Sequence, residues 1–67
     1  MITFAEQIAE AQRELALRKK CYPQWVTSGK LDADTARRRI LVQDEIVRTL
    51  KRLEAEQGQF GLFGAHA

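Results

Sequence analysis

Apolar residues return at alternating steps of four and three over the first 25 residues. The positions in this repeat are Phe4, Ile8, Ala11, Leu15, Arg18, Tyr22 and Trp25, of which only Arg18 is charged. Steps of this size fall on one side of a helix, so the segment predicts an amphipathic α-helix. Thr3 and Glu6 have the spacing of a capping box, in which each side chain bonds the other residue's amide. They place the start of the helix at Phe4.

Pro23 interrupts this pattern near its end. Proline removes one backbone amide, clashes with the preceding turn and moves Tyr22 away from helical dihedral angles. The helix either kinks and continues, or it ends and a short second helix starts with Pro23 at its first position. We expect a kinked continuation through Val26, because Tyr22 and Trp25 stay in phase with the apolar side. Gly29 then predicts a left-handed helix cap.

A second repeat of the same kind follows the glycine. Asp32 is suited to cap a helix that runs from about Ala33 to Gln57 and ends at Gly58. Its inward positions are Ala36, Ile40, Gln43, Val47, Leu50 and Glu54, with Ile46 and Leu53 widening the stripe. A short connection makes consecutive helices antiparallel neighbours. The sequence therefore predicts an all-α fold, an antiparallel two-helix hairpin over residues 1–57.

The size of the chain points to association with other copies. A domain of 67 residues buries only roughly 60% of the surface that its unfolded chain exposes, and such domains usually rely on disulfides, a metal or oligomerisation. Cys21 is the only cysteine, and His66 is too far from it for metal-ligand spacing. Leu17, Cys21, Leu41 and Val42 lie outside both stripes. This extra apolar surface predicts a homo-oligomeric helical assembly, a homodimer or larger.

Charge and hydropathy narrow the classes of function. The net charge of +2 is weak for a nucleic-acid binder, which usually carries a pronounced basic patch, so nonspecific nucleic-acid binding is only a third hypothesis. The sequence has no apolar run of about 18 residues, which a membrane span needs. Its first residues lack the basic and apolar regions of a secretory signal. We expect a cytoplasmic protein with a reduced thiol and no membrane partner.

The sequence holds no recognisable catalytic set. It has no glycine-rich phosphate loop, no zinc-spaced His-Glu pair and no Ser/His/Asp combination. Asp34 and Asp44 each have an arginine four residues later, Arg38 and Arg48, which is the spacing of a solvated helix pair. We predict a non-enzymatic protein with no cofactor and no metal.

Cations and aromatic residues gather around the expected bend and the start of the second helix. We name this set the basic-aromatic corner: Arg18, Lys19, Tyr22, Trp25, Lys30, Arg38 and Arg39. Aromatic rings stack on nucleobases, while arginine and lysine neutralise phosphates. Alternatively, Tyr22 and Trp25 close the end of the core and the cations form a solvated rim. Arg18 favours a ligand, because a cation on an apolar stripe needs an anionic partner.

The stretch from Phe4 to about Leu53 resembles a small family of proteins from tailed phages and prophages of proteobacteria. The resemblance rests on Tyr22, Pro23, Trp25, Val26, Gly29, Ala36 and Ile40. Thr35 departs from it, standing where a glutamate would complete a second capping box. The family carries no established activity, so the resemblance implies only a phage context and, for a phage protein, the host cytoplasm.

Small phage proteins without enzyme chemistry commonly act as inhibitors, adaptors or sponges. Together with the basic-aromatic corner, this context gives our leading hypothesis. It is a phage-type anti-defence protein that sequesters a nucleotide-like ligand, such as a cyclic oligonucleotide immune signal.

The C-terminal segment, residues 58–67, is expected to be a flexible tail because it holds three glycines. Its residues Gln59-Phe60-Gly61-Leu62-Phe63 resemble the pentapeptide by which bacterial proteins bind the DNA polymerase sliding clamp, with Phe60 replacing the usual leucine. In this alternative function, an adaptor or inhibitor binds the clamp through Gln59, Leu62 and Phe63. The competing interpretation is a tail that folds back onto the hairpin.

Overall fold

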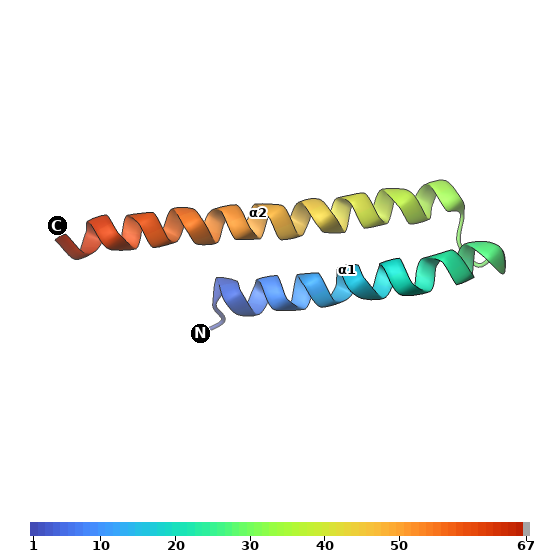
Figure 1. The fold of residues 1–67 in the computed structure, drawn as a ribbon, viewed down its shortest axis with the longest axis horizontal. Helices are drawn as coiled ribbons and strands as arrows, with labels where there is room; N and C mark the ends of the chain where they lie inside the picture. Colours follow the sequence, from blue (N-terminus) through green and yellow to red (C-terminus); the bar gives the residue numbers. More distant parts are fainter. Residues whose placement is uncertain (67) are drawn as a thin grey trace.

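Two helices make up the fold of the computed structural model, which describes the backbone of residues 1–66 and the side chains of residues 1–58. Helix α1 spans Phe4–Thr27 and helix α2 spans Ala33–His66. They lie side by side in antiparallel directions, joined by a short turn at one end (Figure 1). The predicted all-α hairpin is confirmed. Over the described residues, neither helix has an apolar stretch long enough to cross a membrane.

Side-chain caps define where both helices begin. The Thr3 amide donates to the Glu6 carboxylate (2.9 Å), and the Glu6 amide donates to the Thr3 hydroxyl (3.1 Å). At the second helix, the Thr35 amide donates to the Asp32 carboxylate (3.1 Å). Each contact satisfies an amide that has no partner within its helix. The capping box at Thr3 and the cap at Asp32 are both as predicted.

Helix α1 continues through Pro23 and is not broken there. Because proline has no amide hydrogen, one backbone carbonyl in the preceding turn lacks its helical hydrogen bond. Pro23 is exposed, so this carbonyl lies on the solvent side of the helix. The Thr27 hydroxyl donates to the Pro23 carbonyl (3.0 Å) and adds a bond across the last turn.

The turn after α1 is a Schellman cap built on Gly29. Gly29 has φ +79°, the left-handed conformation that favours glycine. The Lys30 amide donates to the Trp25 carbonyl (2.9 Å), and the Gly29 amide donates to the Val26 carbonyl (3.1 Å). This turn confirms the predicted glycine cap and reverses the chain within a few residues.

The core is a single seam between the two helices. Its buried residues are Ile8, Ala11 and Tyr22 from α1 and Ala36, Gln43 and Val47 from α2. Gln43 donates from Nε2 to the Ala11 carbonyl (3.0 Å), so its buried amide group has a partner on the other helix. Trp25 is 43% exposed instead of buried as the repeat predicted, and half-buried Val26 lies closer to the seam.

Two predictions for the second helix are wrong. Helix α2 passes through Gly58 instead of ending there, and Gly29 is the only described glycine with positive φ. A single glycine costs a helix only about 1 kcal/mol relative to alanine, which does not by itself end the helix. Glu54 was placed on the inward stripe but is exposed. The reason is that α2 extends beyond the start of α1 (Figure 1).

The two glycines should respond to alanine in opposite directions. Gly29→Ala should lower the free energy of unfolding by about 1 kcal/mol, because an L-residue is strained in the left-handed conformation. Gly58→Ala should raise it by about 0.5–1 kcal/mol, because alanine favours the helix and its Cβ meets no atom within 4 Å. Urea unfolding at equal protein concentration measures both. Destabilisation by Gly58→Ala would instead indicate a helix end at that residue.

Candidate functional site

Arg18 obtains its anionic partner within the chain. Its side chain is 24% exposed, and its Nε donates to a carboxylate oxygen of Glu14 (3.1 Å) one turn earlier. Its Nη1 donates to the backbone carbonyl of Arg39 on α2 (3.1 Å). Arg18 therefore ties the two helices together, and its position on the stripe no longer argues for an external anion.

The two aromatic residues of the basic-aromatic corner divide between core and surface. Tyr22 is buried at 7% exposure, whereas Trp25 keeps 43% of its surface exposed. Their ring centroids lie 5.5 Å apart at a tilt of 36°, so Tyr22 supports one side of the indole. Trp25 is the ring of this pair that can still stack on a ligand.

The remaining cations of the corner do not converge on Trp25. Lys19, Lys30, Arg38 and Arg39 are all exposed. Lys19 precedes Trp25 by six residues, which places it about 120° away around α1. Arg39 is beside Arg18, since its carbonyl accepts the Arg18 guanidinium. Asp34 pairs with Arg37 (2.8 Å), not with Arg38 as predicted, whereas Asp44 pairs with Arg48 (3.0 Å) as predicted.

One side of the hairpin carries most of the exposed apolar surface. A hollow of about 230 Å³ on α1 is lined by Glu14, Leu17, Arg18, Cys21, Tyr22 and Trp25. A second hollow of about 320 Å³ on α2 is lined by Val42, Glu45, Ile46, Thr49 and Leu50. A groove between the helices includes both Glu14 and Leu50 and therefore connects the two hollows. We name this surface the apolar face and define it by Leu17, Cys21, Trp25, Val42 and Ile46.

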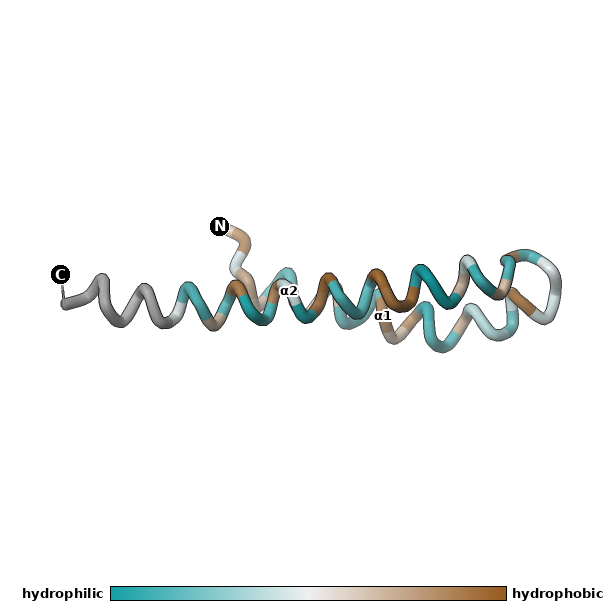
Figure 2. Tube along the Cα trace, turned by 90° about the horizontal axis from the view of Figure 1, so that it is seen from above, coloured by the Kyte–Doolittle hydropathy of each residue, from teal (hydrophilic) through white to brown (hydrophobic). Residues whose placement is uncertain are grey.

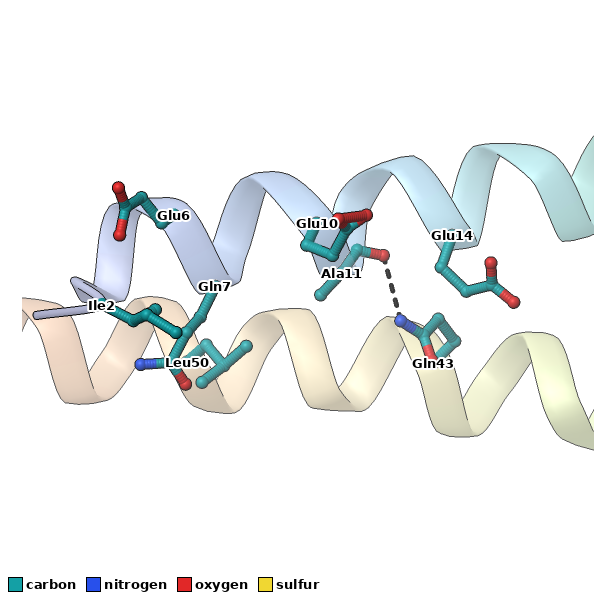
Figure 3. A pocket seen from close by; sticks show the side chains of 8 residues that line it. All are labelled: Ile2, Glu6, Gln7, Glu10, Ala11, Glu14, Gln43 and Leu50. Atoms are coloured by element: carbon teal, nitrogen blue, oxygen red, sulfur yellow. Dashed lines mark hydrogen bonds between the residues drawn. The ribbon is translucent and has the colours of Figure 1, made fainter.

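The connecting groove is acidic along α1. It measures about 620 Å³ and is lined by Ile2, Glu6, Gln7, Glu10, Ala11, Glu14, Gln43 and Leu50. Figure 3 shows Ile2, Gln7 and Leu50 gathered between the helices, with Glu10 and Glu14 following along α1. The hydrogen bonds and charge of Glu10 raise the pKa of the neighbouring Arg13 guanidinium.

Sequence reasoning located this face only in part. It grouped Leu41 with Val42, but Leu41 lines a separate hollow of about 350 Å³ with Pro23 and Val26. It assigned Ile46 to the inward stripe, whereas the residue is 43% exposed. Steps of four from Leu17 to Cys21 to Trp25, and from Val42 to Ile46, could have revealed the face. Apolar and polar stretches alternate along both helices (Figure 2).

The described residues contain no group of three or more histidine, cysteine, aspartate or glutamate side chains placed to hold a metal. The side chains of Gln59, Leu62 and Phe63 lie outside the described residues, so the sliding-clamp motif stays a prediction. No family model, curated protein or solved structure matches this chain. The resemblance to phage proteins likewise stays a prediction.

Arg18 should contribute to stability and Arg38 should not. Arg18→Ala removes a bond to a backbone carbonyl, a bond to Glu14 and packing along the stripe, so we expect a loss of about 1 kcal/mol. Arg38→Ala removes an exposed side chain and should change the free energy of unfolding by less than about 0.5 kcal/mol. Urea unfolding compares the two variants. Equal losses would show that the Arg18 contacts have no net effect.

Proposed function

We propose that this chain is a non-enzymatic association module that binds protein partners by packing helices on its apolar face. The observation that supports the proposal is the exposure of its large apolar side chains. Leu17 is 50% exposed, Val42 45% and Ile46 43%, and the connected hollows place all three on one side of the hairpin. A contiguous exposed apolar surface of this kind marks interaction sites in stable soluble proteins.

The weakness of the internal core supports the same proposal. Among the described residues, no large side chain is fully buried, because each helix has only one neighbour. Apolar burial stabilises by about 25 cal/mol per Å², so covering the apolar face would add several kcal/mol that the single seam lacks. Domains of this size commonly obtain such stabilisation by association.

Neighbouring residues Val42 and Leu41 provide a matched test. Val42→Glu places a carboxylate in the apolar face, and burying it without a partner should raise the dissociation constant of the assembly at least about 100-fold. Leu41→Glu changes a residue of similar exposure, 57%, in the separate hollow and should leave association intact. Sedimentation velocity at micromolar concentration reports the mass of each variant. Association of Val42→Glu at wild-type strength would contradict the proposal, as would a wild-type monomer.

A second candidate function is binding of an anionic, nucleotide-like ligand over Trp25. It is favoured by the half-exposed indole held against Tyr22, with the Arg18 guanidinium lining the same hollow. That hollow, about 230 Å³, is smaller than the roughly 300–1,000 Å³ of enclosed ligand pockets. A base would therefore lie over the indole at the surface, with its phosphates toward Arg18, which lines the same hollow. A protein of this kind would act as a sponge for nucleotide signals.

Replacement of Trp25 tests the ligand hypothesis. Trp25→Ala should weaken nucleotide binding by about 1–3 kcal/mol, a factor of roughly 5 to 150 in Kd, through loss of stacking. Trp25→Phe keeps a ring and should retain most of the affinity. Calorimetric titration with ATP and with cyclic di-AMP measures Kd, and helicity confirms that each variant is folded. Equal affinity of a folded Trp25→Ala protein would exclude the corner as the site.

A further inference from the structure

We infer that the partner on the apolar face is a second copy of this chain, packed face to face in the antiparallel direction. The two turns then lie at opposite ends of a four-helix bundle, with α1 on the partner's α1 and α2 on the partner's α2. This inference rests on the proposed function, because it names the partner of the same face.

Charge along the face favours the antiparallel direction. The half near the start of α1 carries Glu10 and Glu14, whereas the half near the turn carries Arg18 and Arg39. An antiparallel pair with its axis near Val42 places Arg18 of each copy near the partner's Glu6, and Arg39 near the partner's Glu45. Parallel packing would place Arg39 on the partner's Arg18, and close like charges weaken association.

Apolar residues at the two ends of the face favour the same direction. Trp25 stands near the turn, 43% exposed, while Ile2 and Leu53 stand near the opposite end at 74% and 37% exposure. Ile2 lines the groove that belongs to this side of the hairpin. In an antiparallel pair, Trp25 packs near the partner's Ile2 and Leu53. In a parallel pair, Ile2 and Leu53 would meet only each other, and Trp25 would face the start of the partner's α2, which carries Asp32 and Asp34.

The face is large enough for a stable pair. Helix α1 has 24 residues and is about 36 Å long at a rise of 1.5 Å per residue. With a hairpin width of 19 Å, this length gives the face an area of roughly 700 Å². A standard interface buries about 800 Å² on each partner, which is close to this area. A flat two-helix face therefore has the dimensions that a dimer requires.

Val42 marks the expected two-fold axis. Val42 lies eleven residues after Leu31, whose amide donates to the Trp25 carbonyl, and eleven residues before Leu53. A rotation at Val42 would therefore superimpose the two ends of the face. Val42 then lies against the partner's Val42, because α2 packs on the partner's α2. In the parallel arrangement α2 would pack on the partner's α1, and the two Val42 residues would be separated by about one helix spacing, roughly 8–10 Å.

Cysteine cross-linking tests this register in a Cys21→Ser background. A disulfide needs Cα atoms about 4.4–6.8 Å apart, so Val42→Cys should oxidise to a covalent dimer in high yield. Leu41→Cys is the matched control and should remain largely uncrosslinked at the same concentration. Non-reducing electrophoresis separates the species.

Spin labels at the turn test the direction independently. Ser28→Cys in the Cys21→Ser background carries a label on an exposed residue of the turn. Antiparallel packing separates the two labels by about 40 Å, whereas parallel packing brings them within about 20 Å. Double electron–electron resonance measures distances over this range.

The expected results are the mass of a dimer in sedimentation velocity, a covalent dimer of Val42→Cys and a long distance between the two spin labels. A two-copy mass with a short label distance, or with no Val42 cross-link, overturns the antiparallel pair but leaves association through the face intact. A monomeric wild type overturns both this inference and the proposed function. A larger assembly overturns the two-fold pair alone.

Discussion

The contact between α1 and α2 determines where every other feature of this molecule lies. Small residues at Ala11 and Ala36 let the helices approach closely, and Ile8, Tyr22 and Val47 fill the seam. The bond from Gln43 to the Ala11 carbonyl then fixes how far one helix is shifted along the other. In this register the Gln43 amide has a partner across the seam, whereas an unsatisfied buried amide costs about 1–3 kcal/mol. This one polar contact therefore selects the register in which Arg18 reaches the Arg39 carbonyl.

A single seam also explains why the molecule has an unpartnered side. A helix covered by one neighbour protects only a narrow stripe, and the positions on either side of that stripe stay exposed. In this chain the positions on one side are Leu17, Cys21, Trp25, Val42 and Ile46, while those on the other side are mostly polar outside the turn. Packing along the seam would allow both sides to be polar, so the difference between the two sides is a separate property of the sequence. It is the reason to assign a function to that side.

Features that depend on neighbouring residues were predictable, and those that depend on the other helix were not. The capping box at Thr3, the cap at Asp32 and the left-handed Gly29 follow from spacings of a few residues. The exposure of Trp25, and the side on which Val42 and Leu41 lie, depend on where the second helix packs. Arg18 illustrates the difference. Its pairing with Glu14 follows from a spacing of four residues, whereas its bond to the Arg39 carbonyl depends on where the second helix packs.

Trp25 links the two candidate functions, because a ring covered by a protein partner cannot also stack on a base. Their compatibility depends on the direction of packing. In an antiparallel pair, Trp25 lies at the end of the interface, where the partner's α1 is near its own start and leaves one edge of the indole open. Arg18, the cation that lines the same hollow as Trp25, would then lie near the acidic start of the partner's α1. A nucleotide bound at this end would therefore meet one copy's Arg18 beside the partner's carboxylates. Assembly would then weaken anion binding at the corner, which makes association the function that the arrangement of charges serves better.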